Sequence, residues 1–240
     1  MNRENSQAAT TPSTALIPFK LRYHLRMETA EVERLLNQLC AREVIIRGGR
    51  QYKPTETRKA AEWLTRQHRP GLLICGAVGT GKTTLARAIR ELINHLTIAR
   101  VKYEEKGFSY SGICGSLPFE KEDNSFMEAV SATELCRMAA DNPTEYERLK
   151  KCMLLFIDDL GTEPLSVKNY GNEFTPIAEL IEWRNDKMLF TVATTNLSPK
   201  GKSGSSELLE FYGTRTESRM AELFDIIAIK GGDHRKEAKI

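Results

Sequence analysis

The sequence contains no long apolar segment. Within its 240 residues no apolar run approaches the length of a membrane span. Residues 1–18 also lack the basic start and the apolar core of a secretory signal peptide. We therefore expect a cytoplasmic protein without a membrane partner.

Cysteine pairs of the kind that bind zinc are also missing. The five cysteines are odd in number and show no C-x-x-C spacing, so neither a disulfide framework nor a zinc ribbon is indicated. The net charge of +3 is small, which permits contact with nucleic acid through a local patch but does not demand it. A hydrophobic content of 40% and the length of the chain indicate a globular α/β domain with a smaller appendage.

The most informative stretch is a glycine-rich turn at residues 76–83. It follows the apolar run Leu72–Cys75 and opens a segment with helical periodicity, which is the context of a phosphate-binding loop. The alternative is an ordinary strand–turn–helix connection rich in glycine. We expect this loop to bind ATP, with Lys82 on the β and γ phosphates and the Thr83 hydroxyl on Mg²⁺. The expected nucleotide contacts are Gly76, Gly79, Thr80, Gly81, Lys82, Thr83 and Thr84.

A second apolar run, Met153–Ile157, ends in two carboxylates. Such a run is typical of a strand buried on both faces, and ligands bind at the carboxyl ends of parallel strands. Asp158 is therefore expected to hold Mg²⁺, and Asp159 to orient and activate the attacking water. Glu163 is a weaker candidate for the same role. A strand that merely finishes in a polar turn is the alternative.

Three further polar side chains follow later in the chain. The predicted strand Met188–Thr194 leads to Asn196, whose amide could hold the attacking water, although a plain turn residue is the alternative. After a helix over residues 207–212, Arg215 and Arg219 lie four residues apart and share one helix face. Either could reach the γ-phosphate of a neighbouring subunit as an arginine finger, or belong to a solvated basic face. A last strand is predicted over Phe224–Ile229.

The remaining segments suggest the domain organisation. Residues 1–18 show no periodicity and predict a disordered lead-in, whereas residues 19–57 predict a small α/β module, a helix followed by a β-hairpin over Val44–Tyr52, for binding a partner or for support. Residues 58–240 form the predicted core. In it the loop helix runs to about Leu96, and residues 102–124 resemble an insertion. Strands alternating with helices favour a parallel sheet covered on both faces.

The motifs Gly-Ala-Val-Gly-Thr-Gly-Lys-Thr, Leu-Phe-Ile-Asp-Asp-Leu-Gly-Thr-Glu-Pro, Thr-Thr-Asn-Leu and Gly-Thr-Arg-Thr-Glu-Ser-Arg-Met together resemble those of AAA+ ATPases. Within that group they are similar to the DnaC family of helicase loaders and its IstB-like transposition relatives, over about residues 58–236. The resemblance implies a P-loop NTPase with a three-layer α/β/α core and a five-stranded parallel sheet. It also implies that Lys82 and Thr83 are Walker A, Asp158 and Asp159 Walker B, Asn196 sensor 1, and Arg219 the arginine finger, with Arg215 beside it.

Two departures from the AAA+ pattern affect the expected activity. Many AAA+ proteins have Glu where this chain has Asp159, which implies slow hydrolysis, a feature shared by loader-like relatives. The short stretch after the last predicted strand leaves no room for a C-terminal helical lid, which also resembles the loaders, and Arg235 matches an arginine that often stands there in them.

These features lead to one main interpretation and three alternatives. The main one is a helicase loader that forms a homo-oligomer with ATP, grips single-stranded DNA and holds a replicative helicase. A transposition helper that binds duplex DNA is the second. A P-loop kinase for a small acceptor and a nucleotide-gated binding module that never hydrolyses ATP are the others.

Overall fold

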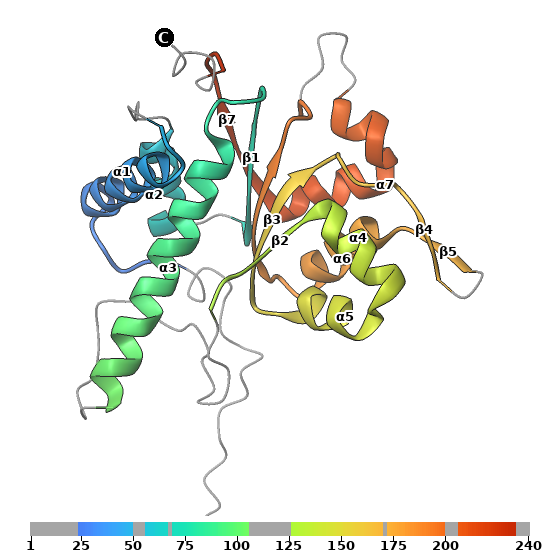
Figure 1. The fold of residues 1–240 in the computed structure, drawn as a ribbon, viewed down its shortest axis with the longest axis horizontal. Helices are drawn as coiled ribbons and strands as arrows, with labels where there is room; N and C mark the ends of the chain where they lie inside the picture. Colours follow the sequence, from blue (N-terminus) through green and yellow to red (C-terminus); the bar gives the residue numbers. More distant parts are fainter. Residues whose placement is uncertain are drawn as a thin grey trace, which may run out of the picture.

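A five-stranded parallel sheet forms the centre of the molecule (Figure 1). The computed structural model describes residues 24–49, 56–66, 69–105, 126–169, 172–199 and 206–233. Its strand order is β2-β3-β6-β1-β7, and every neighbouring pair is parallel. These strands are β1 (Gly71–Gly76), β2 (Glu128–Ser131), β3 (Leu154–Leu160), β6 (Phe190–Thr195) and β7 (Phe224–Ile229). A separate antiparallel pair is formed by β4 (Val167–Asn169) and β5 (Asn172–Phe174).

Helices cover both faces of this sheet, so the predicted three-layer α/β/α core is confirmed (Figure 1). One face carries α1 (Thr29–Ile46), α2 (Thr57–Arg66) and α3 (Lys82–Glu105). The other carries α4 (Ala132–Asp141), α5 (Pro143–Lys151), α6 (Pro176–Asp186) and α7 (Glu207–Leu223). Strand side chains alternate between the two faces, which explains why the central strands are apolar throughout: Leu72 and Ile74 pack with α1 to α3, whereas Leu73 packs with α4 to α7.

The prediction of a β-hairpin over residues 44–52 is wrong for the first strand of that hairpin. Residues 44–46 are the last turn of α1. The Gly48 N–H donates to Ile45 O, the Gly49 N–H donates to Val44 O, and Gly48 has a φ of 77°. This is the Schellman pattern that ends a helix, so the glycine pair caps a helix and does not turn a hairpin. The second arm, residues 50–52, lies outside the described residues.

The described part of the N-terminal region therefore consists of helices, not of the predicted α/β module. Val32, Leu36 and Cys40 of α1 are fully buried, and they share one apolar core with α2, α3 and the sheet. The N-terminal helices are thus packed against the core domain. The boundary at residues 57–58, which falls at the start of α2, stays a prediction.

Other elements differ from the expected ones mainly in length. Helix α3 continues to Glu105, well beyond Leu96, so the first residues of the predicted insertion are helical. Helices α5 and α6 and the β4–β5 pair were not predicted. Helix α7 continues to Leu223, with a break at Gly213. The lead-in at 1–18, the rest of the insertion and Arg235 lie outside the described residues. Among the helices of the described ranges, none is long and apolar enough to cross a membrane.

A buried arginine connects α6 to the sheet. Arg184 has no exposed surface, and its guanidinium donates to the carbonyl oxygens of Cys152 at 2.8 Å and Phe190 at 2.7 Å, and to the Thr191 hydroxyl at 2.8 Å. These acceptors lie where β3 and β6 begin. A guanidinium can donate several hydrogen bonds in one plane, so this one side chain satisfies carbonyl groups that burial would otherwise leave unpaired.

Replacing Arg184 with Ala is expected to destabilise the protein by about 3 kcal/mol or more, because several buried acceptors lose their donor together. Urea unfolding followed by circular dichroism measures this change. Arg58→Ala is the control, since Arg58 is exposed and pairs with Glu62 at the surface. An equal shift of the midpoint in both variants would contradict the role of Arg184.

Candidate nucleotide site

The glycine-rich loop connects the end of β1 to the start of α3 at the carboxyl edge of the sheet, as predicted. Gly76 has a φ of 155°, and a Cβ atom there would lie 2.5 Å from the carbonyl oxygen of Ile229 in β7. Gly79 has a φ of 80°, and a Cβ atom there would lie 1.9 Å from a carboxylate oxygen of Asp233. Both positions therefore require glycine for conformation and for space. The loop is built for the close backbone approach that phosphate binding needs.

Lys82, the first residue of α3, lies within the loop and not in solvent. Its side chain is 5% exposed, and its ammonium donates to Ala77 O at 2.7 Å. The buried Thr80 hydroxyl donates to the same carbonyl oxygen at 2.9 Å. The loop is thus closed on itself by two side chains of its own. The lysine charge is held at the mouth of the helix N-terminus, where an anion is stabilised.

The two halves of the predicted site are in direct contact. The Thr83 hydroxyl donates to Asp158 Oδ1 at 3.0 Å, and the Thr194 hydroxyl donates to the same oxygen at 2.6 Å. Among the described residues no cluster of three or more His, Cys, Asp or Glu could hold a metal ion. One hydroxyl and one carboxylate fit Mg²⁺, which protein sites typically bind through few side chains together with phosphates and water.

A β-bulge shapes the end of β3. Ile157 pairs with Ala193 and Leu160 pairs with Thr195, so β3 has one residue more than β6 between these pairs. Asp159 occupies this bulge with a φ of 58°, a left-handed conformation that Asp tolerates better than most residues. Its N–H donates to the Thr194 hydroxyl at 2.9 Å. The extra residue brings two consecutive carboxylates to the sheet edge while Leu160 returns to the core.

An arginine that sequence reasoning did not single out also approaches the site. Arg87 Nη2 lies 3.8 Å from Asp158 Oδ2, and Arg87 Nη1 donates to Glu43 Oε1 at 3.2 Å. Glu43 belongs to α1, so this arginine connects the N-terminal helix with the candidate metal ligand. Arg87 lies four residues after Thr83, about one turn along α3, so its place beside the site follows from the sequence only once the helix is known.

Glu163 does not have the free carboxylate that a general base needs. The side chain is 4% exposed. It accepts the Gly161 N–H at 2.8 Å with Oε2 and the Tyr212 hydroxyl with Oε1. Burial, and then the charge of Glu163, raise the pKa of the Tyr212 phenol, so the phenol keeps its proton and donates it. Both carboxylate oxygens of Glu163 therefore hold local structure together. The structure gives no support to the prediction that Glu163 activates the attacking water.

The other predicted residues lie in two places. Asn196 follows β6 directly and is exposed at the same sheet edge as Asp158. Arg215 and Arg219 lie on the part of α7 after Gly213. Arg215 pairs with Glu182, and Arg219 donates to Glu222 at 2.9 Å. Glu222 stands just before β7, at the amino edge of the sheet, whereas the glycine loop follows the carboxyl edge. Because β1 is about 17 Å long, the partner of Arg219 lies at the opposite end of the sheet from the glycine loop.

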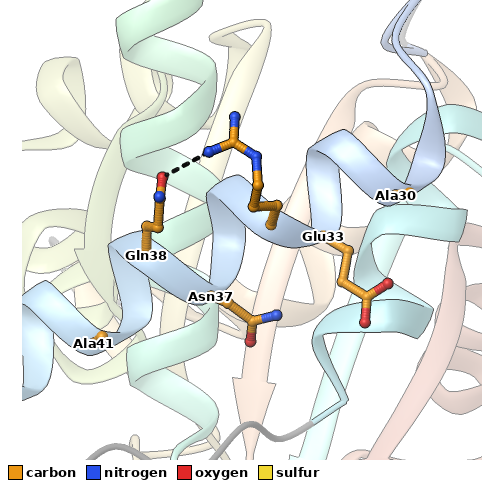
Figure 2. Close-up of a pocket in the computed structure, with 6 residues that line it drawn as sticks. Ala30, Glu33, Asn37, Gln38 and Ala41 are labelled. Atoms are coloured by element: carbon orange, nitrogen blue, oxygen red, sulfur yellow. Dashed lines mark hydrogen bonds between the residues drawn. The ribbon is translucent and has the colours of Figure 1, made fainter.

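The hollow drawn in Figure 2 is separate from this site. It lies along α1 and is lined by Ala30, Glu33, Arg34, Asn37, Gln38 and Ala41. Arg34 donates to Gln38 within it at 3.4 Å, and Asn37 accepts the Thr57 hydroxyl from α2. None of the predicted site residues contributes to it.

The sheet order, the glycine loop and the carboxylates on β3 define a P-loop NTPase fold. In comparison with solved structures, the chain is similar to the DnaC helicase loader, with 22% identity, a TM-score of 0.47, and coverage of 75% of this chain and 94% of that one. The chain is also similar to DnaI, with 19% identity, a TM-score of 0.44, and coverage of 72% of this chain and 82% of that one. It is similar as well to AMPPCP-bound DnaA from Aquifex aeolicus, with 16% identity, a TM-score of 0.38, and coverage of 72% of this chain and 44% of that one. No protein-family model and no curated protein matches the chain.

Replacing Thr194 with Val is expected to raise the Mg²⁺ concentration needed for tight ATP binding by about tenfold, because Asp158 loses the hydroxyl that orients it. Titration with a fluorescent ATP analogue at several Mg²⁺ concentrations measures the shift. Thr97→Val is the matched control, since the Thr97 hydroxyl is buried and bonded to Ile93 O, on a helix surface away from the loop. The same Mg²⁺ dependence in both variants would count against this role of Thr194.

Proposed function

We propose that the chain is an AAA+ ATPase of the DnaC type, which binds ATP with Mg²⁺ and hydrolyses it as a switch. The observation that carries this proposal is the contact between Thr83 and Asp158, which unites the glycine loop and the carboxylate pair in one site. In this proposal the loop backbone and Lys82 hold the phosphates. Thr83 and Asp158 hold the metal, which neutralises charge on the phosphates.

The groups next to the metal site would then act on the attacking water. Asp159 stands one residue after the metal ligand, in the bulge that brings it to the sheet edge. It would accept a hydrogen bond from the water and take its proton. Asn196 is exposed at the carboxyl edge and would orient the same water through its amide without taking a proton. The short Asp159 side chain agrees with slow turnover, which suits a switch.

Arg219 would complete the site of an adjoining copy. Its position near the amino edge of the sheet, away from its own loop, favours action in trans over action in cis. A guanidinium that arrives from a second subunit makes hydrolysis depend on assembly, because developing charge is stabilised only when the neighbour is present. Arg215, paired with Glu182 one turn earlier, would lie in the same interface.

In its cellular role, we propose that the ATP-bound oligomer grips single-stranded DNA and holds a replicative helicase, which hydrolysis releases. This part of the proposal depends on the motif resemblance. Helices α1 and α2 are the candidate attachment for the helicase, since Glu43 of α1 is joined through Arg87 to Asp158. A partner bound on these helices would therefore be connected to the metal site by side-chain contacts.

Arg219→Ala is expected to bind ATP normally and to lose hydrolysis by a factor on the order of 10³, or to the detection limit. Lys82→Ala is expected to lose ATP binding. Mixing the two variants should restore part of the hydrolysis, because Lys82→Ala supplies an intact finger to a partner that still binds ATP. Arg137→Ala is the control, an exposed arginine bonded to Glu134 as Arg219 is to Glu222. No recovery in the mixture would overturn action in trans.

The DNA-dependent part has its own measurement. Single-stranded DNA is expected to change the hydrolysis rate and the assembly size of the ATP-bound protein, and duplex DNA of the same length is expected to do so less. Phosphate release and light scattering report the two quantities. A preference for duplex DNA would instead support the transposition helper. An ATP hydrolysis rate that changes with neither DNA nor a replicative helicase would contradict the proposal of a helicase loader.

A further inference from the structure

The segment that follows the two carboxylates is joined to α7 by a hydrogen bond between the buried Glu163 and the partly buried Tyr212. Glu163 accepts the Gly161 N–H with one carboxylate oxygen and the Tyr212 hydroxyl with the other. Glu163 is 4% exposed, so the pair lies in a medium where an unpartnered carboxylate would be costly. The segment therefore has one preferred position relative to Tyr212, the last residue before the break in α7.

The segment that follows β6 is fastened to the same helix. The Thr195 hydroxyl donates to Leu160 O at 2.7 Å, which holds the ends of β3 and β6 together. Ser198 then exchanges two hydrogen bonds with Glu207, one between their backbones at 3.0 Å and one from its N–H to the Glu207 carboxylate at 2.6 Å. The first half of α7 is thus attached at both ends to the carboxyl edge where Asp158 and Asn196 lie.

The second half of α7 leaves this anchored part at one residue. Gly213 has φ 77° and ψ 166°, which interrupts the helix between Tyr212 and Thr214. The direction of the following helix depends on where its first residue is held, because no helical hydrogen-bond ladder continues through such a break. Arg215 and Arg219 lie on this second half. Arg215 pairs with Glu182 of α6, and Met220 and Leu223 bury this half of the helix in the core. Its first residues follow directly from Tyr212.

We propose that Tyr212 and Glu163 are positioning residues whose hydrogen bond orients α7 beyond Gly213 and thereby places Arg219 for a neighbouring copy. The inference rests on the proposed function for the destination of Arg219. Neither residue touches the nucleotide in this account. The hydrogen bond joins the segment after Asp159 to the helix that carries the finger. The nucleotide site of a subunit and the finger that it offers to its neighbour are therefore held in one fixed relative position.

The variant Tyr212→Phe tests this inference because it removes one hydroxyl and keeps the ring. Tyr146→Phe is the matched control: Tyr146 is buried in the core on this face, and its hydroxyl donates to Pro176 O, in α6, at 2.7 Å and not to the segment that Glu163 belongs to. Hydrogen exchange of the amides in residues 214–223 is expected to rise about tenfold in Tyr212→Phe relative to Tyr146→Phe. Equal exchange in both variants would show that the bond does not orient this helix.

The effect on the arginine finger is measured as ATP hydrolysis, by the single variant and by mixtures in which one variant supplies the finger and the other binds ATP. Tyr212→Phe alone should keep its ATP affinity and lose hydrolysis about tenfold, as expected when a catalytic group is misplaced. Lys82→Ala/Tyr212→Phe should restore about tenfold less hydrolysis to Arg219→Ala than Lys82→Ala does, whereas Lys82→Ala/Tyr146→Phe should restore as much as Lys82→Ala. If Lys82→Ala/Tyr212→Phe restores as much hydrolysis as Lys82→Ala does, the inference is overturned, even if hydrogen exchange in residues 214–223 rises.

Different measurements test the finger in trans and the role of the Tyr212–Glu163 hydrogen bond. The reference mixture, Lys82→Ala with Arg219→Ala, tests the proposed function alone, and its failure overturns action in trans. Hydrogen exchange tests the Tyr212–Glu163 bond alone and does not depend on hydrolysis. Glu163→Gln can still accept the Gly161 N–H with its amide oxygen and can donate its amide N–H to the Tyr212 oxygen, so it should exchange like the unmodified chain. Glu163→Ala should exchange like Tyr212→Phe. The opposite order would contradict the bond's role.

Discussion

A single carboxylate oxygen holds the candidate site together. Asp158 Oδ1 accepts hydroxyls from Thr83 and Thr194. These three residues come from β3, from β6 and from the helix after β1, which are consecutive in the sheet order β2-β3-β6-β1-β7. The contact can form only because the crossover connections bring these strands side by side with their carboxyl ends aligned. The rest of the site is arranged around this oxygen.

The same edge is also where the molecule departs from regular geometry. The bulge at Asp159, the left-handed glycines of the loop and the break in α7 all lie in segments that leave the carboxyl ends of strands or are bonded to such segments. The central strand β6 beneath them is buried at every residue. A rigid sheet thus carries irregular segments whose positions are fixed by a few buried polar contacts, which is how a scaffold holds reactive groups in place.

The sequence predicted the parts of this fold that depend on local pattern. The apolar runs before Gly76 and Asp158 are strands because both of their faces are buried, and glycine spacing alone indicated the loop between β1 and α3. It failed where one local pattern fits two structures. Val44–Ile46 is β-branched and precedes two glycines, which suits a hairpin, yet α1 continues through it because Val32, Leu36 and Cys40 bury one helical stripe.

Apart from the Mg²⁺ site expected of Thr83 and Asp158, contacts between side chains of distant segments could not be predicted from the sequence. Arg87 and Thr194 are unremarkable in the chain, and their roles appear only when α3, β3 and β6 are placed together. Glu163 was noticed for its carboxylate, but its partner Tyr212 follows a long intervening stretch. Asp159 and Asn196 were expected at the sheet edge because strand ends meet there, whereas their exact partners depend on a bulge that no local pattern announces.

The position of β7 has a consequence for how the protein matures. Gly71 pairs with Phe224, and the Gly76 backbone packs against Ile229, so the wall beside the glycine loop comes from near the carboxyl end of the sequence. During synthesis the loop leaves the ribosome long before its wall exists. The nascent chain therefore acquires the complete cradle only after β7 has been synthesised, which delays any nucleotide-dependent assembly until that strand has joined the sheet.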